Sequence, residues 1–218
     1  MLKRTRSISA PSNQPYKRPR TQPKAGFSAS YLTPRRPSIS EKKFFDTTDT
    51  NDVTTAGNIT PINLIRLGND DNNRIGRKIV ITSIQVRARF GLEAAANSSA
   101  VRCALIYDKQ NSGSLPALSD IYDTATAASA EQSMHNLNNR DRFVVLYDEL
   151  FQMDQAQKIT HSFKYYRKVR LETVYGTDGA TIAEISSGAL YWVTIGSVAA
   201  GATDVDQFTT IRVRYLDS

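Results

Sequence analysis

From residue 44 onward, apolar and polar side chains alternate with a period of two in several segments. The clearest segment is residues 80–92, where the apolar side chains share one face and the polar side chains share the other. The apolar set is Val80, Ile84, Val86, Ala88, Phe90 and Leu92, and the polar set is Ser83, Gln85, Arg87 and Arg89. Because successive side chains of a strand point to opposite faces, this pattern predicts a long strand with one buried face.

Other segments have the same character and are rich in the β-branched and aromatic side chains that favour strands. They are residues 59–67, 100–108, 142–153, 159–171, 189–197 and 208–216. Polar and small residues between them predict turns at residues 68–73, 93–99, 108–114, 175–179 and 199–204. The pattern weakens over residues 115–136, where the sequence predicts a short helix at 115–123 and then a long loop.

Seven or eight strands with turns and a few long connections predict an all-β fold of antiparallel strands. We expect an eight-stranded jelly-roll sandwich over residues 44–218, in which two packed sheets are built from two Greek keys. An immunoglobulin-like sandwich fits the same alternation. It is less favoured because Cys103 is the only cysteine, so the Cys…Trp…Cys framework of that fold is missing.

Residues 1–43 differ in composition from the rest of the chain. They hold eleven Lys or Arg and one acid, for a net charge of +10, whereas residues 44–218 hold 17 bases and 20 acids, for −3. They also hold six of the eight prolines and few large apolar side chains. Such a segment buries too little apolar surface to offset its ordering entropy, so we expect residues 1–43 to form a disordered basic arm.

A dense run of Lys and Arg with almost no counter-charge is typical of a segment that binds phosphate groups, because each contact releases counterions. The candidate nucleic-acid-binding residues are Lys3, Arg4, Arg6, Lys17, Arg18, Arg20, Lys24, Arg35, Arg36, Lys42 and Lys43. The first six of them, from Lys3 to Arg20, also form two short clusters of the kind that acts as a nuclear import signal. An anionic membrane is a weaker candidate partner, because the arm lacks the interleaved Trp, Phe and Leu of an interfacial helix.

The sequence shows no motif of a catalytic or cofactor site. There is no glycine-rich phosphate loop, and His135 and His161 are far apart with no Cys or His close by in sequence. We therefore expect no enzyme activity, no catalytic residue, no cofactor and no metal. Asp46, Asp49 and Asp52 leave calcium open, but without the spacing, glycine and closing glutamate of an EF-hand they are better interpreted as a solvated strand-to-loop segment.

The chain also lacks the sequence signals of membrane targeting. No continuous apolar core follows the N-terminal charges, so we do not expect a secretory signal. No run approaches the ~18 apolar residues of a membrane span.

Four segments resemble geminivirus coat proteins, in the same order along the chain. They are residues 76–86, 136–146, with the motif Asn-Leu…Arg-Asp-Arg-Phe, 188–199 and 209–218. The first looks like the strand that starts their folded shell domain, and the last two look like their final strands. The chain is shorter than those proteins and lacks their Cys-x-x-Cys/His elements, so a related virus group is expected rather than a true geminivirus.

The resemblance implies the capsid protein of a virus with a circular single-stranded DNA genome. Copies of it would close into an icosahedral shell, of about 60 subunits in the simplest case, and would package that DNA through the arm. Implied partners are other copies of the chain, the genome and a nuclear import receptor, with the protein in the virion and, during assembly, in the host nucleus. Two alternatives remain open: a single-stranded nucleic-acid-binding or movement-type protein without a shell, and a carbohydrate-binding jelly roll.

Overall fold

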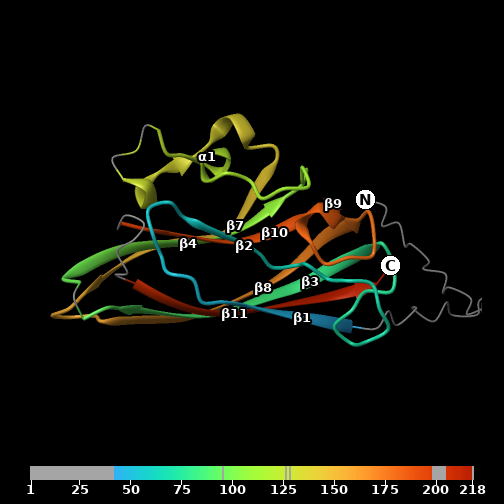
Figure 1. The fold of residues 1–218 in the computed structure, drawn as a ribbon, viewed down its shortest axis with the longest axis horizontal. Helices are drawn as coiled ribbons and strands as arrows, with labels where there is room; N and C mark the ends of the chain where they lie inside the picture. Colours follow the sequence, from blue (N-terminus) through green and yellow to red (C-terminus); the bar gives the residue numbers. More distant parts are fainter. Residues whose placement is uncertain (1–41, 95, 126, 128, 198–204, 218) are drawn as a thin grey trace, which may run out of the picture. The chain divides into compact units, whose positions relative to one another are not determined.

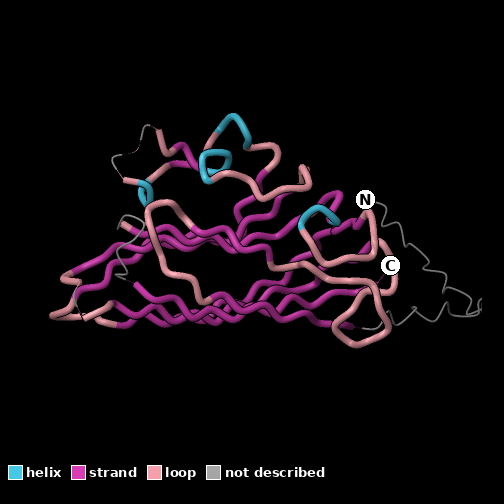
Figure 2. Tube along the Cα trace, viewed as in Figure 1, coloured by secondary structure: helices cyan, strands magenta, loops and turns pink. Residues whose placement is uncertain are grey.

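Strands dominate the part of the chain that the computed structural model describes, which is residues 42–94, 96–125, 127, 129–197 and 205–217. The chain divides into two units, residues 1–38 and 39–218, and every described residue belongs to the second unit. Figure 2 shows how little of this unit is helical. The strands are β1 (Lys42–Asp49), β2 (Asn58–Pro61), β3 (Lys78–Leu92), β4 (Ser98–Asp108), β5 (Tyr122–Asp123), β6 (Met134–His135), β7 (Phe143–Asp154), β8 (Thr160–Tyr175), β9 (Ile185–Ser187), β10 (Ala189–Gly196) and β11 (Val205–Asp217).

Two antiparallel sheets face each other within this unit (Figure 1). The larger sheet has the strand order β1-β11-β3-β8-β9, and the smaller has the order β2-β10-β4-β7. Leaving aside the short β5, β6 and β9, the described strands pair first with last: β1 with β11, β2 with β10, β3 with β8 and β4 with β7. An antiparallel ribbon paired in this way and wrapped into two sheets is the jelly roll, so the predicted fold class is confirmed.

The core lies between the two sheets and is made by their inward-facing side chains. Phe90, Trp192 and Val213 are fully buried there, one from each of β3, β10 and β11. All eight residues of β10 are buried. This explains why residues 189–197 form a continuous apolar run instead of alternating: a strand covered on both faces needs apolar side chains on both.

A bulge near the start of β3 reverses which of its first side chains face the core. The register of β3 against both of its neighbours shifts between Ile81 and Ser83. Thr82 is the extra residue, and its hydroxyl donates to the carbonyl oxygen of Arg214. A bulge reverses the alternation, so Ile79 and Ile81 are buried on the core side, and the prediction that Val80 shares a face with Ile84 is wrong.

The segment predicted as a strand at residues 59–67 is a strand only as far as Pro61. Beyond Pro61 the chain leaves the sheet, and the fully buried side chain of Asn63 makes hydrogen bonds in place of strand pairing. Its amide nitrogen donates to the carbonyl of Gly188 and to the hydroxyl of Thr173, and its side-chain oxygen accepts from the backbone N–H of Leu190. Ile62 and Ile65 are therefore buried without being in a strand, which a periodicity of two cannot reveal.

The connection between β4 and β7 forms an insertion on the outer side of the smaller sheet (Figure 1, top). It contains the predicted short helix, α1 (Leu118–Ile121), and the two-stranded pair β5–β6. Two 3₁₀ turns, Ala130–Gln132 and Leu137–Asn139, lie in the same insertion, and a third, Ile182–Glu184, precedes β9. Much of the expected loop is therefore ordered. Among the described residues no helix has the length and apolar character needed to cross a membrane.

Candidate nucleic-acid interface

The outward face of the larger sheet gathers cations from three neighbouring strands. We call the following six residues the basic face: Arg87 and Arg89 of β3, Lys164 and Lys168 of β8, and Arg212 and Arg214 of β11. Each lies at a position that alternates with core residues on its own strand, so the alternation that builds the core also directs the cations to the other side.

The strand register places one pair of these cations side by side and the others nearby on the same face. Arg87 is paired with Lys164 on one side and with Thr210 on the other. Ser83 lies between Arg214 and Lys168 in the same way. Residues directly opposite in antiparallel strands point to the same face. Arg87 and Lys164 are therefore direct neighbours, whereas the other four cations lie on the same face with polar, acidic or aromatic residues opposite them.

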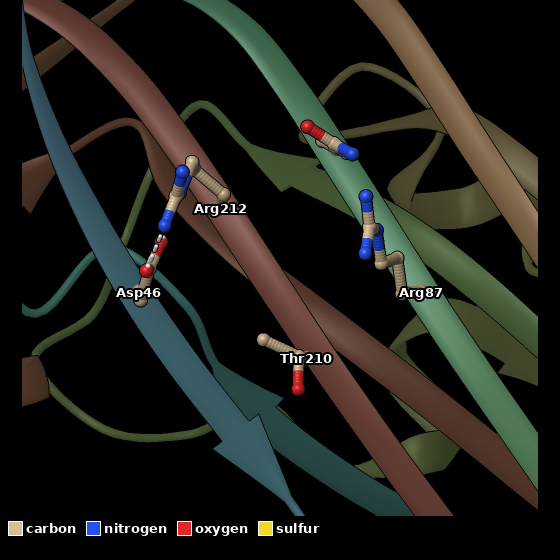
Figure 3. Close-up of a pocket in the computed structure, with 5 residues that line it drawn as sticks. Asp46, Arg87, Thr210 and Arg212 are labelled. Atoms are coloured by element: carbon tan, nitrogen blue, oxygen red, sulfur yellow. Dashed lines mark hydrogen bonds and ion pairs between the residues drawn. The ribbon is translucent and has the colours of Figure 1, made fainter.

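Figure 3 shows one end of this face, where a shallow hollow of about 190 Å³ lies between β1, β11 and β3. Arg212 points toward Asp46 and makes two hydrogen bonds to its carboxylate, of 2.7 and 2.6 Å. These bonds raise the pKa of Arg212. Arg87 lines the same hollow from β3, and Asp46 is the only carboxylate among the residues that line it.

Three aromatic side chains on the same face are largely exposed. Phe44 of β1 is 41% exposed, Tyr166 of β8 is 52% exposed and Phe208 of β11 is 47% exposed. The guanidinium carbon of Arg212 lies 4.7 Å from the ring centre of Phe44, and that of Arg89 lies 4.7 Å from the ring centre of Phe208. The face therefore combines cations with flat apolar surfaces, a composition found in sites for unpaired nucleic acid.

Comparison with known families identifies the chain. The model of a family described as the satellite tobacco necrosis virus coat protein matches residues 35–218. The chain belongs to this coat protein family. The family match covers all strands of the described unit. Of the three hypotheses, it favours a viral coat protein over a movement-type protein and over a carbohydrate-binding protein.

Two curated coat proteins are similar to this one. The coat protein of Satellite tobacco necrosis virus 2 is 29% identical over 178 residues, which are 81% of this chain and 86% of that protein. The coat protein of Maize white line mosaic Satellite virus is 30% identical over 95 residues, which are 43% of this chain and 44% of that protein.

Among solved structures, the chain is similar to a chain from the structure of Desmodium yellow mottle tymovirus, with a TM-score of 0.37 and 12% identity over 88% of this chain and 96% of that one. Cocksfoot mottle virus gives a TM-score of 0.33 and 11% identity over 97% of this chain and 96% of that one. Similarity at this level carries no argument, and the fold assignment rests on the strand order.

The family differs from the one that the sequence resemblance implied. The expectation of a viral coat protein is confirmed, but the matching family is that of a satellite virus and not the geminivirus coat proteins. Residues 188–199 and 209–218 largely coincide with β10 and β11, and residues 76–86 with the first half of β3. Their patterns follow from their burial in the strands of a jelly roll, so they indicate the fold and not one family. β3 is also the third strand of the coat protein and not its first.

The structure separates two neighbouring lysines of the predicted arm. Both Lys42 and Lys43 lie in β1, so the folded part begins before residue 44. Lys42 is exposed, whereas Lys43 is 3% exposed, donates to the carbonyl oxygen of Asn73 and lies 3.4 Å from a carboxylate oxygen of Asp217. Assigning Lys43 to nucleic-acid binding is therefore wrong, because its ammonium group is buried and paired.

The remaining arm residues lie outside the described residues and stay predictions. They are Lys3, Arg4, Arg6, Lys17, Arg18, Arg20, Lys24, Arg35 and Arg36. The expected disorder of the arm and the two nuclear import clusters fall on the same residues.

The cluster of cations and tyrosines at residues 164–170 is divided between the two sides of β8. Lys164, Tyr166 and Lys168 point outward with the basic face, whereas the hydroxyl of Tyr165 donates to the carbonyl oxygen of Leu146 on the other side. Phe44 and Phe208, which the sequence analysis did not single out, are the other exposed aromatic side chains of this face. Their signal in the sequence is an aromatic residue at an outward position of a strand.

The three aspartates that left calcium open do not converge. Asp46 points outward to Arg212, whereas Asp49 is 4% exposed on the opposite side of β1. The carboxylate of Asp49 accepts hydrogen bonds from Asn51, Asn58 and Thr60. The interpretation of this segment as solvated is therefore wrong for Asp49. Across the described residues, no group of three or more His, Cys, Asp or Glu is arranged to hold a metal ion.

On the opposite side of the molecule, charged groups hold the insertion against the smaller sheet. Arg102 of β4 donates to both carboxylate oxygens of Asp148 at 2.8 and 2.5 Å and also to the carbonyl oxygen of Ser133. His135 lies 3.1 Å from the same carboxylate. The other histidine, His161, packs against the ring of Phe151, and burial lowers its pKa.

Proposed function

We propose that this coat protein packages a single-stranded RNA genome inside a shell of its own copies and holds that RNA with the basic face as well as with the N-terminal arm. Its relatives form shells of many subunits and are capsids of RNA viruses, which favours RNA over the DNA that the geminivirus resemblance implied. The folded part of the chain then contacts RNA with its own side chains, independently of residues 1–41.

The observation that carries the proposal is the gathering of six cations on the outward face of three neighbouring strands of the larger sheet. Six cations on one side of a sheet, with Asp46 already paired to Arg212, form a surface that repels other cations and attracts a polyanion. A closed shell has one inner and one outer side, and the side that faces the genome gains most from such a surface. We therefore assign the larger sheet to the inner side and the insertion on the smaller sheet to the outer side.

Exchange of two neighbouring cations tests the proposal. The double variant Arg87→Gln, Lys164→Gln removes the neighbouring pair across β3 and β8, and Lys109→Gln, just after β4, is a control outside the larger sheet. The full chain is titrated with a short single-stranded RNA at rising salt. We expect the slope of log affinity against log salt to fall by about 0.7 for each lost phosphate contact.

The control should keep the wild-type slope. A double variant that also keeps it would show that the basic face does not contact phosphate. Nucleic acid extracted from assembled particles gives a separate test of the genome type: it should be degraded by ribonuclease and resist deoxyribonuclease. The reverse result would restore the DNA hypothesis.

A further inference from the structure

The three exposed aromatic side chains of the larger sheet lie among cations and not among apolar neighbours. Single exposed apolar residues are common on protein surfaces and need no explanation. Phe44, Tyr166 and Phe208, however, share one face, and each is adjacent to at least one cation of that face. The apolar area that they expose is therefore part of a mixed surface of rings and positive charges.

Two of the rings form similar pairs on opposite sides of β11. The guanidinium of Arg89 lies over Phe208, and that of Arg212 lies over Phe44. Asp46 holds Arg212 by two hydrogen bonds, which fixes the orientation of its guanidinium plane. Guanidinium planes and aromatic rings are both surfaces on which nucleobases stack.

A hollow of about 660 Å³ lies beside the first pair. Its lining includes Phe208, Ser162 and the three cations Arg87, Arg89 and Lys164. It is a shallow depression that is open to solvent and not an enclosed cleft. A flat apolar wall with cations around it suits a nucleotide, whose base is flat and whose phosphate is anionic.

We infer that this face binds unpaired nucleobases by stacking, with Phe208, Phe44 and Tyr166 as the stacking residues and the surrounding cations as phosphate contacts. The inference rests on the proposed function and specifies its ligand. The basic face binds unpaired segments of the genome and not duplex segments. In a duplex the faces of the bases are covered by their neighbours, so the rings have nothing to stack on.

The test compares two strands that carry the same phosphates. One is a short unpaired oligoribonucleotide, and the other is an abasic strand of the same length. The full chain, the double variant Phe44→Leu, Phe208→Leu and the control Leu137→Ala are titrated with both strands at one salt concentration. Leucine keeps the apolar side chain and removes the ring, and Leu137 is an exposed apolar residue of the insertion, away from the larger sheet.

Wild type and control should bind the base-bearing strand about fivefold or more tightly than the abasic strand, which is the lower limit for stacking of one base. The double variant should lose most of that difference and keep its affinity for the abasic strand. A cross-linking measurement with 5-iodouridine in the oligonucleotide should map to the peptide that contains Phe208.

Three other results would overturn the inference. Equal affinity of wild type for the two strands would leave the proposed function standing and remove the stacking. Absence of binding to either strand would remove both. A double variant that keeps the preference for bases but no longer assembles would show that Phe44 and Phe208 contact another copy of the coat protein instead of nucleic acid.

Discussion

Lys43 is a buried cation in the first strand of the coat protein, with the carbonyl of Asn73 and the carboxylate of Asp217 as its partners. Replacing it by methionine keeps the length of the side chain and removes the ammonium group from both contacts. We expect Lys43→Met to lower the free energy of unfolding by about 2 kcal/mol, less than for a fully buried pair because Asp217 is partly exposed. Thermal or denaturant unfolding of the purified subunit measures the change.

The adjacent Lys42 provides the matched control, because it is exposed on the same strand. Lys42→Met should change the free energy of unfolding by less than about 0.5 kcal/mol. If the two variants were equally stable, the buried pair of Lys43 would contribute nothing to the fold.

At the scale of elements, the insertion between β4 and β7 is held by the carboxylate of Asp148. Burial by itself would raise the pKa of this carboxyl, but the hydrogen bonds and charges of Arg102 and His135 outweigh it and lower the pKa to about 2. Folding therefore favours the ionised form. The resulting stabilisation is complete when the pH is above 3.8, the pKa of the carboxyl in the unfolded chain. It is lost as the pH falls through about 2, the pKa in the folded protein.

Asp148→Asn should show this dependence directly. We expect it to lower the free energy of unfolding by about 1 kcal/mol at neutral pH, a value reduced for solvent screening of a partly exposed group. The difference from wild type should shrink as the pH falls from 4 to 2. Asp141→Asn, an exposed carboxyl in the neighbouring turn, is the control at each pH. A difference that stays constant over this range would mean that the carboxylate charge does not hold the insertion.

At the scale of the whole molecule, the net positive charge lies in the arm and not in the folded unit. Residues 1–38 hold nine of the eleven cations assigned to the arm, and they precede β1. We expect deletion of these residues to leave a folded protein with an unchanged unfolding temperature and much less co-purifying nucleic acid, because most of the released counterions come from the arm. The ratio of absorbance at 260 and 280 nm measures the nucleic acid.

A full-length variant in which the nine cations become glutamine controls for the length of the arm. It should lose nucleic acid as the deletion does. If the deletion keeps as much nucleic acid as the full chain, the basic face and not the arm is the main binder.

The candidate site was partly visible in the sequence. The outward position of Arg87, Arg89, Arg212 and Arg214 follows from strand alternation, which is a local property. Their assembly into one surface is not local. Asp46 and Arg212 are 166 positions apart in the chain, and only the pairing of β1 with β11 brings them together.

The sequence by itself determined the all-β class, the turns between most strands and the separation of a basic arm from a nearly neutral domain. These depend on side-chain period and composition, which neighbouring residues express together. Only the tertiary structure decided which strands pair, where Thr82 interrupts the alternation of β3, and why Lys43 is buried while Lys42 is exposed. Each of these depends on contacts between distant segments, because burial and register are set by the partner strand and not by the residue itself.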